Sequence, residues 1–194
     1  MTPESIQIHE DWNTFDESYD ADIAMLTFKA GSIKNTMFIQ PICLWKEEHK
    51  EFPLEIGTFV GWGQRQHRGN FEPIPSKLTV LIHTNEDCFS ENYELESLSS
   101  QRTFCGGAGD GTGPCFYDSG SSVVIKVEST FYLRGIFSSI LLSEIRTCDL
   151  DTYQIYTDAF KYLRWMQNKM NKVVCKINME NESKSCVVDH QDPV

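Results

Sequence analysis

The chain has 194 residues, 40% of them hydrophobic, enough to bury the core of one large domain or of two half-domains that share a cleft. A net charge of -11, from 17 basic and 28 acidic residues, argues against nucleic acid or an anionic membrane surface as the main partner. No apolar stretch approaches the roughly 20 residues of a membrane span, and the N-terminus lacks the apolar core of an export signal.

Short runs of β-type composition, bounded by turn residues, recur along the chain and predict a mostly-β domain. In chain order these runs span residues 22–28, 57–63, 76–83, 121–128, 131–142 and 153–158. Residues 91–102 are predicted to form a short surface helix with a solvated acidic face. Residues 105–115 read CGGAGDGTGPC, and glycines at this density predict a loop with backbone angles that are closed to other residues.

One longer helix is predicted near the C-terminus, with Thr157 as its N-cap. Apolar residues recur there at three- and four-residue intervals on one face, namely Ala159, Leu163, Met166 and Met170. We expect this helix to dock on the β domain. The sequence after it is polar and without periodicity, which divides the chain into a domain at 1–171 and an irregular tail at 172–194.

Seven cysteines stand at irregular spacings, without the paired C-x-x-C knuckles that are typical of a zinc site. We therefore expect disulfides, and neither a metal nor another cofactor. Asn181-Glu182-Ser183 is an N-glycosylation acceptor sequence, which has meaning only in a secreted chain. Secretory cysteine usage beside a missing export signal leads us to expect that the N-terminus of the sequence is incomplete.

Ser119 is the candidate nucleophile, because it lies in an Asp-Ser-Gly triplet within GPCFYDSGSS, residues 113–122. A serine attacks a carbonyl only when a base takes its proton, and the histidine that acts as this base usually requires a buried carboxylate to orient it. Asp22 is the candidate carboxylate, since it opens the alternating apolar run 22–28 and would be held at the start of a strand. By pattern alone, an aspartate before a strand is more often an ordinary turn residue.

Several segments resemble the trypsin/chymotrypsin family of serine endopeptidases in their order and approximate spacing. They are DADIAML, PICLW, GTFVGWG, CGG followed by GPCFYDSGSS, LRGIFSS and TYQIYTDAFKYLRWM, and the match runs from about Ile6 to Met170. The Gly-x-Gly-Pro-Cys lead-in and the Asp-Ser-Gly-Ser variant are most similar to the insect clip-associated, gastrulation-defective-like branch. The resemblance implies a chymotrypsin-like double antiparallel β-barrel, here with the first barrel incomplete, plus a C-terminal helix.

The resemblance also implies a role for each residue of the candidate site. Asp22 resembles the triad aspartate and Ser119 the nucleophile, while Asp118 resembles the acid that pairs with the amino group freed by activation cleavage. The backbone N–H groups of Tyr117 and Ser119 would form the oxyanion hole. Tyr117 stands where the family has glycine, whose φ values strain a side chain, so we expect an impaired hole.

The specificity pocket implied by the resemblance is lined by Gly113, Ser138, Ser139, Ile140 and Gln154. Gly113 stands where trypsin-like members carry an aspartate, so strict specificity for arginine or lysine is not expected. Gln154 replaces a pocket glycine, and its larger side chain would narrow the pocket and disfavour large substrate side chains.

The catalytic histidine of the family has no counterpart here. The family places it in an Ala-Ala-His-Cys-like stretch some tens of residues before the triad aspartate, and His9 is the one histidine on that side of Asp22. His9 resembles a residue of a structural strand edge. The other histidines, which lie in segments resembling loops and strands away from the cleft, are His49, His67, His83 and His190. We expect the chain on its own to be inactive.

Two family disulfides are implied, Cys88–Cys105 and Cys115–Cys148, each worth about 3 to 4 kcal/mol in the chain-entropy model. Cys43 resembles the cysteine that links such a domain to its propeptide, and the pairing of Cys43, Cys175 and Cys186 stays open. The resemblance implies an extracellular location. The expected partner is a protein or peptide substrate, or another protease.

Two functions remain open. The first is a serine endopeptidase whose sequence has lost its N-terminal part, and an upstream Ala-Ala-His-Cys-like segment would support it. The second is a protease homologue without catalytic activity, which binds a protease or a substrate and regulates an extracellular cascade. Tyr117 and the altered pocket favour the second. A small disulfide-stapled binding domain that merely echoes the family is a weaker third alternative.

Overall fold

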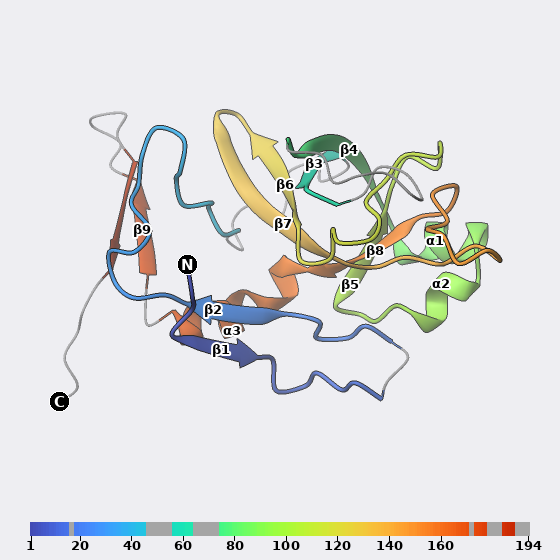
Figure 1. The fold of residues 1–194 in the computed structure, drawn as a ribbon, viewed down its shortest axis with the longest axis horizontal. Helices are drawn as coiled ribbons and strands as arrows, with labels where there is room; N and C mark the ends of the chain where they lie inside the picture. The colour runs from blue at the N-terminus through green and yellow to red at the C-terminus, as the bar shows by residue number, and fades with distance from the viewer. Residues whose placement is uncertain (16–17, 46–55, 64–73, 171–172, 178–183, 189–194) are drawn as a thin grey trace.

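The largest unit of the protein is a closed antiparallel barrel, which fills the centre of Figure 1. The computed structural model describes residues 1–15, 18–45, 56–63, 74–170, 173–177 and 184–188. Within these residues, two further sheets of two strands each stand outside the barrel, one formed near the N-terminus and one near the C-terminus. The chain is therefore a mostly-β protein, as the sequence predicts.

The barrel strands are hydrogen-bonded in the order β3-β4-β5-β8-β7-β6. Their bounds are β3 Ile56–Gly61, β4 Ser76–His83, β5 Thr103–Gly106, β6 Ser122–Val127, β7 Thr130–Ser139 and β8 Gln154–Asp158. Side chains from all six strands meet in one buried cluster, which consists of Phe59, Val80, Phe104, Val123, Phe137 and Tyr156. Each of these strands except β5 overlaps a run that the sequence predicts. The candidate nucleophile Ser119 lies just before β6 of this barrel.

The N-terminal sheet consists of β1 (Ser5–Ile8) and β2 (Ala24–Thr27), which pair only with each other among the described residues. Its apolar side chains Ile6, Ile8 and Leu26 are 50% or more exposed. Two strands on their own are marginally stable in water, so this sheet depends on packing against the rest of the chain. This open pair is the incomplete first barrel that the family resemblance implies.

The C-terminal helix begins as the 3₁₀ helix Ala159–Tyr162 and continues as α3 (Leu163–Lys169). Thr157 as its N-cap is wrong, because Thr157 still belongs to β8 and its hydroxyl donates to the carbonyl oxygen of Asp22 at 2.9 Å. The cap is Asp158, whose carboxylate accepts from a backbone N–H of the first turn. The cap therefore lies one residue later than predicted, at the end of the predicted β run 153–158.

The docking of this helix is as predicted. Trp165 and Met166 of α3 are buried in one cluster with Ala21 and Ile23, which lie just before β2. The helix therefore lies against the N-terminal sheet, as Figure 1 shows for α3 and β2. This contact joins the open sheet to the barrel.

Two short helices, α1 (Asn85–Glu91) and α2 (Glu94–Ser97), connect β4 to β5. The sequence predicts a helix at 91–102, and α2 falls within that range. The sequence analysis missed α1, although Thr84 caps it by accepting a hydrogen bond from the Asp87 N–H at 3.1 Å. A threonine followed three residues later by an acid is a start signal that could have identified this helix.

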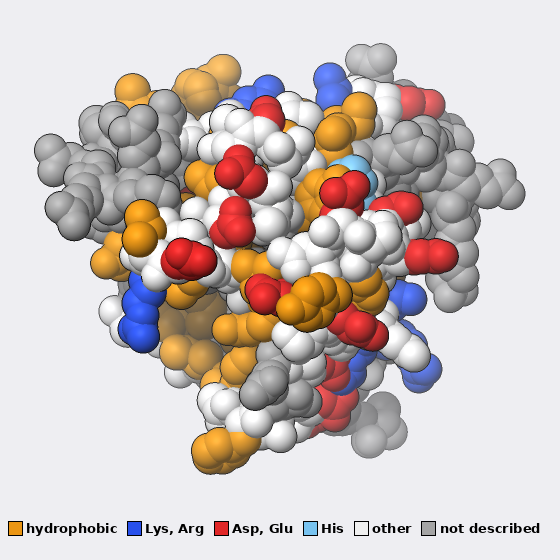
Figure 2. Space-filling view, turned by 90° about the vertical axis from the view of Figure 1, so that its right-hand side faces the viewer, with side chains coloured by type: hydrophobic (Ala, Val, Ile, Leu, Met, Phe, Trp, Pro, Cys, Tyr) orange, Lys and Arg blue, Asp and Glu red, His pale blue; other side chains and the backbone are white. Residues whose placement is uncertain are grey.

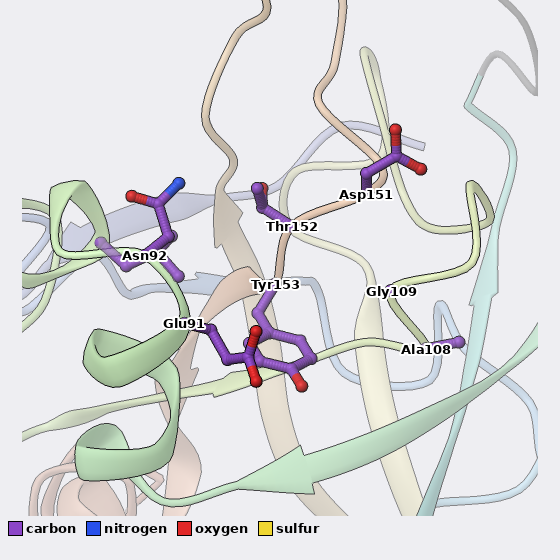
Figure 3. A pocket seen from close by; sticks show the side chains of 8 residues that line it. Glu91, Asn92, Ala108, Gly109, Asp151, Thr152 and Tyr153 are labelled. Atoms are coloured by element: carbon purple, nitrogen blue, oxygen red, sulfur yellow. The ribbon is translucent and has the colours of Figure 1, made fainter.

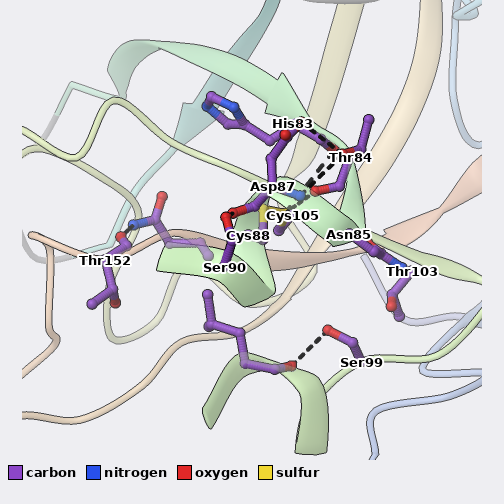
Figure 4. The surroundings of a disulfide bond; sticks show 12 residues. His83, Thr84, Asn85, Asp87, Cys88, Ser90, Ser99, Thr103, Cys105 and Thr152 are labelled. Atoms are coloured by element: carbon purple, nitrogen blue, oxygen red, sulfur yellow. Dashed lines mark hydrogen bonds between the residues drawn. A yellow bond between two sulfur atoms is a disulfide. The ribbon is translucent and has the colours of Figure 1, made fainter. Parts of the chain in front are cut away.

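Both predicted disulfides are confirmed. Cys88 of α1 is bonded to Cys105 of β5, and Figure 4 shows how this bond fixes the helix to the barrel wall below Thr84. Cys115 is bonded to Cys148, which joins the loop before Ser119 to the loop before β8. The second bond lies next to the turn that carries Ser119.

The C-terminal sheet is a hairpin in which β9 (Val173–Ile177) pairs antiparallel with β10 (Lys184–Val188), at the left of Figure 1. These strands lie in the segment 172–194, for which the sequence predicts an irregular tail. The register places Cys175 opposite Cys186. The pairing of these two cysteines remains an open prediction.

Candidate active site

Ser119 lies at the tip of a tight turn between the Cys115–Cys148 disulfide and β6, and it is exposed. The Asp118 N–H donates to the carbonyl oxygen of Cys115 at 3.1 Å, and the Ser121 N–H donates to that of Asp118 at 2.9 Å. Gly120 has a φ of 89°, which a side chain would oppose. The turn thus presents the hydroxyl of Ser119 to solvent on a rigid base.

Tyr117 adopts a φ of 69°, the left-handed region that normally belongs to glycine. Such a conformation costs a non-glycine residue about 1–3 kcal/mol and persists only where the surroundings enforce it. Its side chain is 72% exposed. The backbone therefore has the curvature of a glycine turn despite the tyrosine, and the bulk of the ring lies in solvent beside Ser119.

Asp22 and Ser119 are brought together through one residue, Ser138. The Ser138 hydroxyl donates to Oδ2 of Asp22 at 2.6 Å, and the Ser119 Oγ donates to the carbonyl oxygen of Ser138 at 3.2 Å. Asp22 is held from the other side by the Thr157 hydroxyl on its carbonyl oxygen. The sequence predicts all three residues for the site, and the structure places them in one chain of hydrogen bonds.

Neither described histidine lies in this chain of hydrogen bonds. The ring of His9 packs between Tyr162 and Trp165, with centroid distances of 5.1 and 5.0 Å, and its Nδ1 accepts from the Asp11 N–H at 3.1 Å. His83 lies against the ring of Tyr153 at 4.3 Å. Both are packed in structural positions, as the sequence predicts, whereas His49, His67 and His190 lie outside the described residues.

Asp118 is buried, and its carboxylate accepts two backbone hydrogen bonds. The N–H of Gly63 donates to Oδ1 at 2.7 Å, and the N–H of Cys115 donates to Oδ2 at 3.1 Å. Hydrogen bonds to a charged acceptor are among the stronger ones, so these two donors offset part of the cost of burying the acid. A Cβ at Gly61 or Gly63 would collide with this carboxylate, which explains the second and third glycines of the GTFVGWG motif.

A cavity of about 200 Å³ lies next to the buried carboxylate. Its lining includes Asp118, Gly63 and Gly113, together with Lys77 at the start of β4. An acid with open space beside it is suited to receive a cationic group. The charge of Asp118 also acts on Tyr156, where burial and this charge together raise the pKa of the phenol far above its ordinary value.

The residues predicted for the specificity pocket come from three neighbouring segments. Ser138 and Ser139 end β7 and are buried, and Ser139 pairs in register with Ile155 of β8. Gln154 begins β8 and is completely buried. A Cβ built at Gly113 would lie 3.1 Å from both amide atoms of Gln154, so these two residues are in contact. Ile140 follows β7 and packs, partly buried, against the barrel core.

Cys43 is a free cysteine on the side of the barrel. It forms an isolated bridge to Tyr132 of β7, in which the Cys43 N–H donates to Phe131 and the carbonyl oxygen of Cys43 accepts from Leu133 at 3.0 Å. The structure therefore fixes its backbone and leaves its thiol without a disulfide. The link to a propeptide stays a prediction.

A second cavity, of about 220 Å³, lies between α1 and the loop before β8. Figure 3 shows the side chains that line it, among them Glu91 and Asn92 on one side and Asp151 and Tyr153 from the loop before β8. The face of the molecule seen in Figure 2 carries acidic side chains over much of its surface. A negative surface of this kind agrees with the charge of the chain and repels polyanions.

Two further features concern metals and membranes. No group of three or more histidine, cysteine or acidic residues among the described residues could hold a metal ion. In the same part of the chain, no helix has the length and apolar character that a membrane crossing requires.

Comparison with known proteins places this geometry in a family. The trypsin family model matches residues 2–166. Serine protease gd of Drosophila melanogaster is 32% identical over 84% of this chain, and CLIP domain-containing serine protease B15 of Anopheles gambiae is 28% identical over 86%. Coagulation factor IX of Cavia porcellus is 28% identical over 82%.

The chain spans 37% of the first of these relatives, 45% of the second and 54% of the third. The match nevertheless includes the closed barrel, the Ser119 turn, Asp22 and most of the C-terminal helix. The chain belongs to the trypsin family of serine proteases.

Proposed function

We propose that Asp22 and Ser119 are the acid and the nucleophile of a peptide-cleaving triad. We also propose that this chain lacks the histidine of that triad. The observation that supports this most is the hydrogen-bonded path from Ser119 through Ser138 to Asp22. A triad needs an exposed serine and a fixed aspartate on either side of an imidazole. Here Ser119 lies on a tight turn, the Ser138 hydroxyl holds the carboxylate of Asp22, and the Thr157 hydroxyl holds its backbone carbonyl oxygen.

Turnover by the 194 residues alone should be negligible. Removing the histidine of a triad costs on the order of 10⁶ in kcat in subtilisin, and only positioning and oxyanion effects remain. Without a base at Ser119, the proton has no acceptor during attack on the carbonyl. The same hydroxyl could act in a longer polypeptide that places an imidazole between Asp22 and Ser119.

The oxyanion hole is assigned to the backbone N–H groups of Tyr117 and Ser119. The positive φ of Tyr117 gives its backbone the conformation that a glycine normally adopts. Its exposed side chain adds bulk next to Ser119. Misdirecting one oxyanion donor costs about 10² to 10³ in rate. Tyr117→Gly should therefore raise the reactivity of Ser119 in any form of the protein that has a base.

Asp118 is proposed as the acid that receives the ammonium group of a chain freed by activation cleavage. The cavity beside it supports this role, because a cation placed there would meet a buried carboxylate whose hydrogen bonds from the described residues are two backbone N–H groups. We expect an extracellular location, since the two disulfides persist in oxidising surroundings. The proposed partner is a protein or peptide substrate, or another protease, and Cys43 is proposed to link the domain to a propeptide.

A second candidate function is a non-catalytic homologue that binds a protease or a substrate and regulates an extracellular cascade. Two observations favour it. Tyr117 has a strained backbone beside Ser119, and the buried side chain of Gln154 contacts Gly113, another residue that is predicted for the specificity pocket. The names of the related CLIP domain-containing serine proteases give no support to a non-catalytic role. The second candidate function therefore rests on Tyr117 and Gln154 alone.

The test is covalent labelling of Ser119 by a fluorophosphonate probe. We expect no adduct with the 194-residue chain, and an adduct with an activated, longer polypeptide that supplies an Ala-Ala-His-Cys-like segment before Asp22. Ser119→Ala is the control. No labelling despite an intact histidine, followed by labelling of the Tyr117→Gly variant, would favour the regulatory homologue.

A further inference from the structure

The C-terminal hairpin stands outside the barrel and carries two of the cysteines whose pairing is open. Its strands β9 and β10 pair only with each other among the described residues, at the left of Figure 1. A two-stranded hairpin on its own is marginally stable in water at best. The hairpin therefore needs a further source of stability, from packing or from a cross-link.

The register of the hairpin places Cys175 of β9 directly opposite Cys186 of β10. In an antiparallel pair, the Cα atoms of two directly opposed residues lie about 4.5 to 5.5 Å apart. The Cα atoms of two disulfide-bonded cysteines usually lie about 4.4 to 6.8 Å apart. The backbone of the hairpin therefore meets the distance requirement of a disulfide between these two cysteines without rearrangement.

The sequences of the two strands match this register. Residues 173–175 read Val-Val-Cys, and residues 186–188 read Cys-Val-Val. The register pairs each valine of the first run with a valine of the second. Valine favours strands, and a slip by one residue would move the side chains of one strand to the other face of the sheet. The sequence and the register thus agree in bringing the two cysteines together.

Cys43 is the third cysteine whose pairing is open. Its backbone is held against β7 by two hydrogen bonds, from its N–H to Phe131 and to its carbonyl oxygen from Leu133, and its thiol is free. A bond from Cys43 to either cysteine of the hairpin would leave the opposite cysteine without a partner. A bond across the hairpin leaves one free thiol, at Cys43, which is the smallest number that seven cysteines allow.

We propose that Cys175 and Cys186 form a cross-strand disulfide, which stabilises the C-terminal hairpin and leaves the thiol of Cys43 for a partner. The oxidant is the disulfide of oxidised glutathione or of a thiol oxidoreductase. One cysteine thiolate attacks this disulfide, which gives a mixed disulfide and releases one thiol of the oxidant. The second thiolate then attacks the mixed disulfide and releases the other. The two cysteines lose two electrons and two protons, and the oxidant gains them as two thiols.

The experiment maps the thiols of the full chain after folding with reduced and oxidised glutathione. The protein is denatured without a reductant, treated with N-ethylmaleimide and digested with trypsin, which cuts after lysine and arginine. Mass spectrometry should find the peptides 173–176 and 185–194 joined by a disulfide, although residues 177–184 separate them in the sequence. The maleimide should be on Cys43. A maleimide on Cys175 or Cys186, or a bond from Cys43 to either, would overturn the proposal.

A double variant, Cys175→Ser with Cys186→Ser, tests whether the bond stabilises the hairpin. The amides of β9 and β10 should exchange hydrogen at least about tenfold faster than in the unsubstituted chain, because the strands are no longer cross-linked. The amides of β7 should keep their rates. Cys43→Ser is the matched control and should change neither set. Unchanged exchange in β9 and β10 of the double variant would overturn the stabilising role.

The two measurements are independent of each other and of the proposed catalysis. If the double variant fails to fold, the thiol map of the unsubstituted chain still decides whether the bond exists. Neither measurement uses Ser119 or Asp22, so a parent protein that fails to label at Ser119 leaves the proposed disulfide in place.

Discussion

The closed barrel and the open N-terminal sheet differ in how much of the site each can hold by itself. The barrel provides Ser119, Ser138 and Gln154, and every strand in it has two neighbours. Asp22 lies in the segment just before β2. Among the described residues, β2 pairs with β1 alone. The proposed nucleophile, Ser119, is thus positioned by a closed barrel, whereas the proposed acid, Asp22, depends on contacts between the two regions.

We call these contacts the seam, defined by Ala21, Asp20, Arg102, Tyr162 and Trp165. The Tyr162 hydroxyl accepts a hydrogen bond from the Ala21 N–H at 2.9 Å, and Trp165 is buried against the same segment. Arg102 forms an ion pair with Asp20 from the barrel side. We therefore expect substitutions in the seam to raise the hydrogen-exchange rates of β1 and β2 more than those of the barrel strands.

The largest effect is expected from Trp165→Ala. It removes a buried indole and its contacts with the Ala21 segment, which should lower the free energy of unfolding by about 3–5 kcal/mol. Denaturant unfolding measures the loss, and hydrogen exchange locates it. Phe15→Ala is the control, because Phe15 is 95% exposed and its loss should stay within about 0.5 kcal/mol. Equal loss of protection in the barrel and in β1–β2 would contradict the comparison.

A smaller effect is expected from Tyr162→Phe. The change keeps the ring and removes the acceptor of the buried Ala21 N–H, which should cost about 1–3 kcal/mol. Because Asp22 follows Ala21 directly, the exchange rates of amides 21–23 should rise more than those of β6 or β7. If the exchange rates of amides 21–23 stay unchanged while the free energy of unfolding falls, the Tyr162 hydroxyl does not hold the segment that contains Asp22.

The smallest effect concerns the Arg102–Asp20 pair and depends on pH. The hydrogen bond from Arg102 holds the pKa of Asp20 below its ordinary value, so the pair stabilises the fold above the unfolded pKa of 3.8. This contribution is lost as the pH falls through the lower folded pKa. Arg102→Gln should therefore lower the free energy of unfolding by less than about 1 kcal/mol at neutral pH, and it should leave that free energy unchanged at strongly acidic pH.

Unfolding curves of the wild type and the Arg102→Gln variant at neutral and acidic pH measure this difference. Arg164→Gln removes an exposed arginine outside the seam and serves as the matched control. A difference between wild type and Arg102→Gln that persists unchanged into strong acid would show that the arginine acts through its packing over Tyr162, not through its charge.

The sequence predicts most of the barrel, since alternating apolar runs are local patterns. The roles of the candidate site residues come from the resemblance to a family and stay predictions. The local pattern fails where a distant strand decides the outcome. Thr157 has the local features of a cap, yet it remains in β8 because its hydroxyl meets Asp22 across the fold. The two backbone donors to Asp118 and the unpaired Oε1 of Gln154 likewise arise from tertiary contacts that no local pattern encodes.

The most direct test is ester hydrolysis by the purified 194-residue chain, measured beside its Ser119→Ala variant. Asp22, Ser138 and Ser119 can orient an imidazole but cannot replace it as a base, so the two proteins should show the same background rate. A rate that exceeds this background and disappears with Ser119→Ala would contradict the account.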